Sequence, residues 1–185
     1  MTRMKTLLLF LLSVFIAATL PARGQIVEVP LNDRITQSDF IFEGRVLAKE
    51  SFWNEEHNNI YTLNYVQVYK IFKGDERPEK VMVVTPGGAV GDKAIFIDHV
   101  LKLSPNKVGL FFVKLANGKF NTHEACYDAF ATQQSFIEYD LVDKIAADQF
   151  KVYENINRNL YKVIRKKTKK PYIEIKHFDI NKKNS

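Results

Sequence analysis

The sequence has almost no cysteine: Cys126 is the single one among 185 residues. One thiol excludes an internal disulfide, so the hydrophobic core must hold the fold without a covalent crosslink. We interpret Cys126 as a small buried side chain. A reactive thiol and an intermolecular disulfide are the alternatives.

The motifs of several enzyme classes are also missing. The glycine-rich segment 87–91 lacks the Gly-Lys-Ser/Thr of a phosphate-binding loop, and no helical pattern follows it, so it predicts a turn. No Gly-x-Ser-x-Gly occurs, which excludes the usual esterase arrangement. The sequence therefore indicates no cofactor.

A zinc-protease motif begins but is not completed. The motif needs a second histidine four residues after the first, and the segment that starts with His123 and Glu124 has a tyrosine there. A weaker metal site stays open, with His123 and Cys126 as two ligands and His57 or His99 among the others. A small secreted hydrolase or metal-dependent enzyme that uses His123, Glu124 and Cys126 is therefore one alternative function.

Paired carboxylates are the remaining candidates for acid–base chemistry. Asp39 and Glu43 form one pair, and Glu55 and Glu56 form another. Acidic side chains are mostly solvated in folded proteins, so we interpret all four as surface residues.

Long apolar runs are confined to the first residues. Two basic residues, Arg3 and Lys5, precede an uncharged apolar run (7–20), and small residues at 22 and 24 mark a cleavage position before Gln25. This is the layout of a secretory signal peptide, and the run is shorter than the roughly 20 residues of a membrane span. We predict a signal peptide over 1–24 and export to the periplasm or the exterior. No transmembrane segment is expected after cleavage.

The charge is unevenly distributed. Residues 25–161 hold 15 Lys/Arg against 19 Asp/Glu, whereas residues 162–185 hold nine against two. The run 165–170 is suited to attract anionic lipid or polysaccharide, and a solvated helix end is the simpler alternative. An exported protein rarely meets nucleic acid, so no nucleic-acid partner is expected.

The remaining chain is dominated by short β-type runs separated by turn residues. Asn117-Gly118 is a strong hairpin signal. The expected strands cover 40–47, 60–72, 81–85, 94–100, 108–115, 119–122 and 135–141. The run 108–115 is apolar on both faces, which favours closure into a small OB-like barrel. A β-sandwich is the alternative.

One late helix is predicted over about 155–168. Asn155 is suited to cap its start, and Pro171 follows its end. Its apolar stripe is expected to cover one opening or face of the barrel. The predicted organisation is thus a signal peptide (1–24), a single β-rich domain (25–170) and a basic tail (171–185).

Four segments in order resemble a known group. They are Ser38–Val46, Ile71–Gly74, Val83–Gly88 and Gly109–Phe112. Their order is similar to an N-terminal β domain at the front of large exported bacterial proteins, many of them cargo of the type IX secretion system. The resemblance implies a non-catalytic module with no catalytic residues to transfer. A structural spacer of a longer protein is accordingly another alternative.

Two loops are the expected contact surface. Trp53 lies at a strand end beside the polar loop 54–59, which contains His57, and the loop 86–92 contains Gly87 and Gly88. An exposed tryptophan suits a partner or ligand, although it would equally serve to plug the barrel end. The leading hypothesis is an exported, non-enzymatic interaction module. It would bind a protein or glycan of the envelope or exterior through Trp53, His57, Gly87 and Gly88.

Overall fold

The computed structural model describes residues 26–116 and 126–179. The predicted signal peptide (1–24), Gln25, the predicted hairpin and strand over 117–122, and the last residues (180–185) lie outside the described residues. His123 and Glu124 lie outside them as well. Within the described ranges, no helix has the length and apolar character needed to cross a bilayer.

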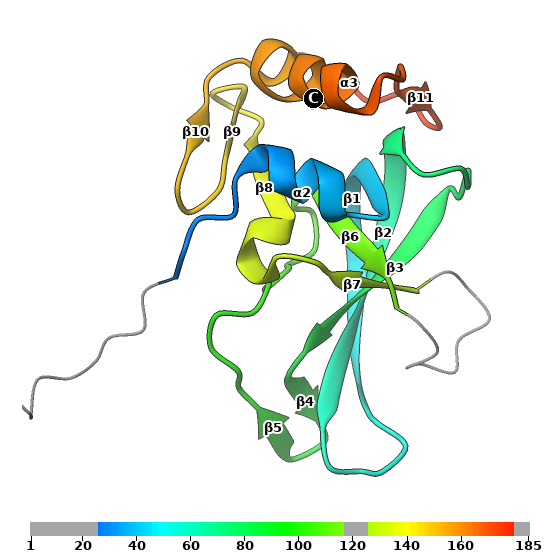
Figure 1. The fold of residues 1–185 in the computed structure, drawn as a ribbon. Coiled ribbons are helices and arrows are strands. Elements are labelled where there is room, and N and C mark those ends of the chain that lie inside the picture. Colours follow the sequence, from blue (N-terminus) through cyan, green and yellow to red (C-terminus); the bar gives the residue numbers. More distant parts are fainter. Residues whose placement is uncertain (1–25, 117–125, 180–185) are drawn as a thin grey trace, which may run out of the picture.

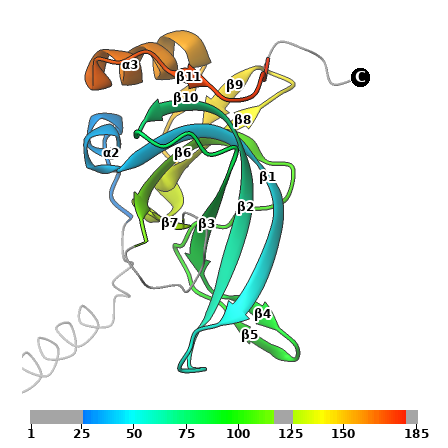
Figure 2. The same cartoon turned by 90° about the vertical axis from the view of Figure 1, so that its right-hand side faces the viewer.

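Five strands close into a barrel, which confirms the OB-like prediction (Figures 1 and 2). They are β1 (Phe40–Trp53), β2 (Ile60–Lys73), β3 (Lys80–Pro86), β6 (Val108–Leu115) and β7 (Cys126–Ala129). The ring runs β1-β2-β3-β7-β6, and β6 pairs back to β1. All pairs are antiparallel except β3–β7. Because these pairings form a closed ring, the alternative of an open β-sandwich is wrong.

The barrel closes where β6 pairs with β1. Gly44 faces Gly109 in their register, and each glycine allows a close contact with the strand on its other side: a Cβ on Gly109 would lie 2.2 Å from the Ile137 carbonyl oxygen, and one on Gly44 would lie 2.5 Å from the Gln67 carbonyl oxygen. Only glycine fits such an approach. Register shifts along β1, which are typical of β-bulges, bend it around the core.

β6 is apolar on both faces, as predicted, because it separates two clusters. Phe42 and Phe111 stack inside the barrel with ring centroids 4.8 Å apart. The alternate residues Ile41 and Phe112 point outward into a second cluster beneath the helices. Alternation along each strand thus supplies both clusters.

The predicted late helix is present. A π-helical turn, η2 (Asn157–Tyr161), leads into α3 (Lys162–Thr168). The Asn155 side-chain oxygen accepts a hydrogen bond from the Arg158 amide at 2.8 Å, which confirms the predicted cap. Buried Leu160 and Ile164 face the second cluster. Viewed as in Figure 1, the helix lies across the end of the barrel opposite the hairpin of β4 (Gly88–Val90) and β5 (Lys93–Ile95).

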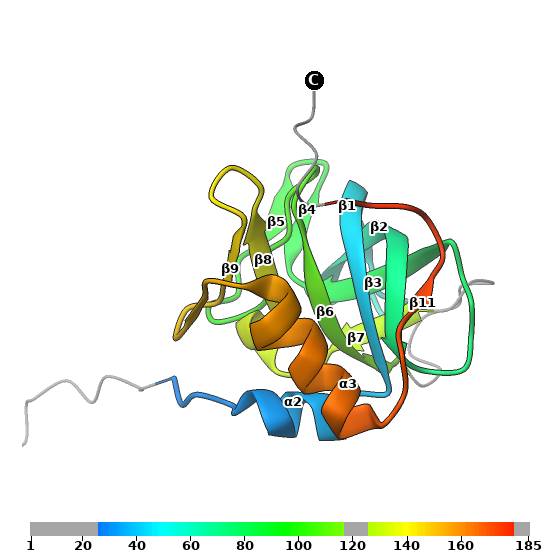
Figure 3. The ribbon, with the colours of Figure 1, turned by 90° about the horizontal axis from the view of Figure 1, so that it is seen from above.

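A second helix, α2 (Leu31–Gln37), was not predicted and lies beside α3 (Figure 3). The Lys73 ammonium group donates hydrogen bonds to the carbonyl oxygens of Ile35 (3.0 Å), Thr36 (2.9 Å) and Ser38, at the end of this helix. Burial lowers the pKa of Lys73. A lysine on β2 therefore caps a helix that is too short to be stable alone.

The remaining elements are short. The expected strand over 94–100 is confirmed only at its first two residues: a hairpin of β4 (Gly88–Val90) and β5 (Lys93–Ile95) is present, and the chain leaves regular structure at Phe96. The 3₁₀ turn η1 (Thr132–Ser135) precedes β8, which extends the sheet from β6, and β11 pairs with β2. These strands are β8 (Phe136–Asp140), β9 (Ile145–Ala147), β10 (Val152–Tyr153) and β11 (Ile173–Glu174).

Candidate functional site

The β1–β2 hairpin carries two of the predicted contact residues. Its turn is held by Asn54, whose side-chain oxygen accepts hydrogen bonds from the amides of Asn58 (3.0 Å) and Asn59 (2.9 Å). This turn brings the exposed His57 ring parallel to the half-buried ring of Trp53, with centroids 6.2 Å apart. The tryptophan therefore stacks on the hairpin surface, and it is not a buried plug of the barrel.

Gly87 and Gly88 position the β4–β5 hairpin against β1 and β2. The Gly87 amide donates to the Ile60 carbonyl oxygen at 2.8 Å, and the Thr62 hydroxyl donates to the Gly87 carbonyl oxygen at 2.7 Å. Gly88 has φ +143°, and a Cβ there would lie 2.4 Å from the Ser51 hydroxyl oxygen. The Gly87 amide and carbonyl are both hydrogen-bonded within the protein, and Gly88 pairs with Ile95 in the β4–β5 hairpin, so these glycines shape the loop end of the barrel.

A hollow of about 350 Å³ opens between β2, β3, the β4–β5 hairpin and the segment 96–104. We call it the loop-end hollow. Part of its lining is polar and buried, with Asn64 donating to the Val83 carbonyl oxygen (2.9 Å) and to the Thr85 hydroxyl (3.1 Å). The apolar part of the lining is Ile95, Phe96, Ile97, Val100 and Leu103. Both predicted glycines line the hollow, whereas Trp53 and His57 lie outside its lining.

Phe96 is the residue of this surface that the sequence analysis missed. Its side chain is 89% exposed. The expected strand over 94–100 placed it in regular structure, so its exposure was not foreseen. An isolated exposed hydrophobic residue is common, but here it borders an apolar hollow.

The described residues contain no group of three histidine, cysteine or carboxylate side chains that is suited to hold a metal ion. Cys126 lies on β7, buried beside Met82 and Val84. His57 belongs to the β1–β2 hairpin, and its proposed co-ligand His123 lies outside the described residues.

A fully buried carboxylate contradicts one sequence interpretation. Glu43, expected at the surface, has no exposed area and accepts a hydrogen bond from Lys70 at 2.6 Å. The hydroxyls of Tyr139 (3.1 Å) and Tyr161 donate to its other oxygen. Burial and the Glu43 charge raise the pKa of both tyrosines, so both are protonated donors. The Lys70 ammonium also donates to the Phe178 carbonyl oxygen at 3.1 Å.

This cluster links β1, β2, β8, η2 and the segment that follows α3. Its carboxylate is closed to solvent, so a substrate has no access to it. Its hydrogen bonds instead fix the helix and the C-terminal segment onto the barrel. We therefore interpret the cluster as structural.

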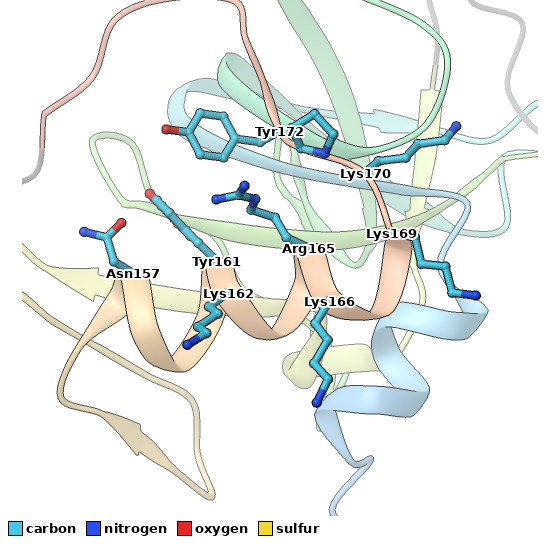
Figure 4. A pocket seen from close by; sticks show the side chains of 9 residues that line it. Asn157, Tyr161, Lys162, Arg165, Lys166, Lys169, Lys170 and Tyr172 are labelled. Carbon is cyan, nitrogen blue, oxygen red and sulfur yellow. The ribbon is translucent and has the colours of Figure 1, made fainter.

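A second hollow, the basic cleft, has a volume of about 760 Å³ and lies along α3 (Figure 4). Its lining contains no acidic side chain. The cationic lining residues are Lys162, Arg165, Lys166, Lys169 and Lys170, all of them exposed. Tyr161 and Tyr172 supply aromatic surface to the same cleft. The arrangement is suited to attract anions.

A comparison with models of known protein families finds no match, and a comparison with curated proteins finds no significantly similar sequence. The resemblance to the N-terminal β domain of type IX cargo therefore stays a prediction.

Proposed function

We propose that this protein is an exported, non-enzymatic interaction module that binds a protein partner through the loop end of its barrel. The observation that carries the proposal is the loop-end hollow with the exposed Phe96 at its edge. Export is supported by the signal-peptide pattern of residues 1–24, and the partner is expected in the envelope or outside the cell.

The chemistry of the loop-end hollow favours a protein over a glycan. The buried polar side chains of Thr62 and Asn64 already donate hydrogen bonds within the barrel, which leaves fewer groups to bind sugar hydroxyls. The apolar lining and Phe96 suit an apolar side chain, the kind of contact found at the centre of protein interfaces. Lys49 and Lys102 also line the hollow. The expected partner segment therefore presents one large apolar side chain flanked by carboxylates.

Peptide display against the purified protein tests this proposal. Selected peptides are expected to combine an apolar anchor with acidic neighbours. The variant Phe96→Ser is expected to weaken their binding by roughly 30-fold, which corresponds to about 2 kcal/mol for a central interface residue. Trp53→Ala is expected to weaken it by a smaller factor, because Trp53 lies outside the lining of the hollow.

Val142→Ser is the matched control. Val142 is 87% exposed but lies in the turn after β8, outside the lining of the hollow. Peptides that bind all three variants equally would place the contact elsewhere. If neutral glycans bind and peptides do not, and if the glycan binding depends on Phe96 in the same way, the partner is a glycan and not a protein.

A further inference from the structure

The basic cleft has a positive charge that ion pairs within the described structure leave almost entirely uncompensated. Of its five cations, Lys170 approaches Asp75 at 3.7 Å, but both side chains are largely exposed and such a pair contributes little. The other four form no ion pair with a described residue. The cleft therefore presents a row of solvated positive charges on a domain whose body (25–161) is acidic.

This charge exceeds what the helix needs. Cations near a helix C-terminus are stabilising through the helix dipole, an effect that falls off within the last turn, and Lys162 lies at the first residue of α3, outside that turn. Within α3, Lys162 and Lys166 stand four residues apart, whereas Lys169, with a left-handed φ of +58°, and Lys170 follow the end of the helix at Thr168. Like charges at that spacing destabilise a helix by a few tenths of a kcal/mol per pair. A bound anion would offset this repulsion.

The cleft also has a fixed aromatic wall. Tyr161 is buried and donates its hydroxyl hydrogen to Glu43, and its ring meets that of Tyr172 edge-on at 5.9 Å. Phe72 supports Tyr172 from behind, with ring centroids 5.5 Å apart. Figure 4 shows Arg165 reaching toward the space between the two tyrosines. A rigid apolar wall beside cations suits a ring that carries an anionic group.

We propose that the basic cleft binds an acidic polysaccharide, whose sulfate, phosphate or carboxylate groups pair with the lysines and Arg165 while a sugar ring packs on Tyr172. A membrane surface is a poorer fit, because the cleft is concave and its described lining offers no leucine, isoleucine, valine or phenylalanine side chain to insert among lipids. Helix α3, which lines the cleft, lies at the opposite end of the barrel from the β4–β5 hairpin, which lines the loop-end hollow (Figure 1). The site therefore does not depend on the function proposed for the loop end.

The test measures binding of the purified protein to dextran sulfate and polygalacturonate, with neutral dextran as the uncharged probe. Binding to at least one acidic polymer, weakened by added salt, is expected. The double variant Arg165→Gln/Lys169→Gln is expected to lose about tenfold or more in affinity. The matched control Lys49→Gln/Lys102→Gln removes the same charge from the loop-end hollow and is expected to bind almost as the unaltered protein does.

Three outcomes would overturn the proposal. An equal loss in the control pair would mean that only net charge matters. Binding of neutral dextran with the same affinity would show that the cleft does not recognise the anionic groups. Binding to anionic phospholipid vesicles but to neither acidic polymer would assign the cleft to a lipid surface. Phe96→Ser, which tests the loop end, is expected to leave polysaccharide binding unchanged, so the two proposals fail separately.

Discussion

Removing either partner of the Glu43–Lys70 pair should strongly destabilise the fold. Lys70→Met leaves a fully buried carboxylate without its counter-ion, a change that costs about 3–5 kcal/mol. The hydroxyls of Tyr139 and Tyr161 still solvate that carboxylate, so we expect the lower end of the range. Glu43→Gln keeps an acceptor for both hydroxyls but leaves the ammonium group unpaired.

The ammonium group retains partial compensation in that second variant. Rings of Tyr161, Tyr172 and Phe178 lie within 5.5–5.9 Å of the Lys70 nitrogen. Cation–π contacts of this kind are worth about 0.5–2 kcal/mol. We therefore expect Glu43→Gln to cost about 2–3 kcal/mol, less than Lys70→Met.

A double-mutant cycle isolates the pair. Each single substitution leaves the other charged group unpaired. The double variant Glu43→Gln/Lys70→Met should therefore lose about 2 kcal/mol less free energy of unfolding than the sum of the two single variants. Urea unfolding followed by far-ultraviolet circular dichroism gives all four free energies of unfolding. Additivity within about 0.5 kcal/mol, or single losses below about 1 kcal/mol, would refute the account of a coupled buried pair.

Three further predictions follow from buried or strained groups. Burial raises the pKa of Tyr139 and Tyr161 in the folded protein, so their contribution to the free energy of unfolding is fully present below about pH 10, where tyrosines of the unfolded chain begin to ionise. The contribution is lost as the pH rises above that value, and the urea midpoint should fall there. The midpoint of the double variant Tyr139→Phe/Tyr161→Phe should fall less. Asp148→Asn leaves the buried guanidinium of Arg34, which is 2.8 Å from Asp148, without its counter-ion; we expect a loss of about 3–5 kcal/mol in the same assay, and a loss below about 1 kcal/mol would contradict the pairing. Gly88→Ala should lower the free energy of unfolding by about 1–3 kcal/mol or more, because Gly88 has a positive φ. It should also weaken peptide binding at the loop end. Unchanged binding would show that the β4–β5 hairpin does not shape the loop-end hollow.

The sequence predicted the parts of the fold that depend on local pattern. The strands over 60–72 and 108–115 follow from dense β-branched and aromatic runs, and β2 and β6 confirm them. The late helix was found from its cap at Asn155 and its apolar stripe, both of which are local signals.

The features that were missed depend on distant partners. Helix α2 has seven residues and is capped by Lys73, which is 35 or more positions away in the chain. The expected strand over 94–100 had the right residue types but no neighbouring strand to pair with beyond Ile95.

The buried pair did leave a signal in the sequence. Glu43 follows three apolar residues in β1, and Lys70 stands between Tyr69 and Ile71 in β2. The two are direct partners in the β1–β2 register. Opposite charges at facing positions inside two locally apolar stretches predict a buried ion pair once the register is known. Without the register, Glu43 was placed at the surface.

The predicted contact residues were found only in part. Trp53 and His57 stack on one hairpin, and Gly87 and Gly88 line the neighbouring hollow. Phe96 and the apolar lining came from the structure alone, because the shape of a hollow is set by how several loops pack together.

Site-specific photocrosslinking tests the interaction-module proposal most directly. A photoreactive phenylalanine analogue replaces Phe96 in one sample and Val142 in another, both highly exposed positions. We predict a discrete adduct between position 96 and a displayed peptide or native partner, and no adduct from position 142. An excess of the unaltered protein, added as a competitor, should suppress the adduct, whereas an excess of the Phe96→Ser variant should not. Equal adducts from both positions, or suppression by both competitors, would contradict the proposal.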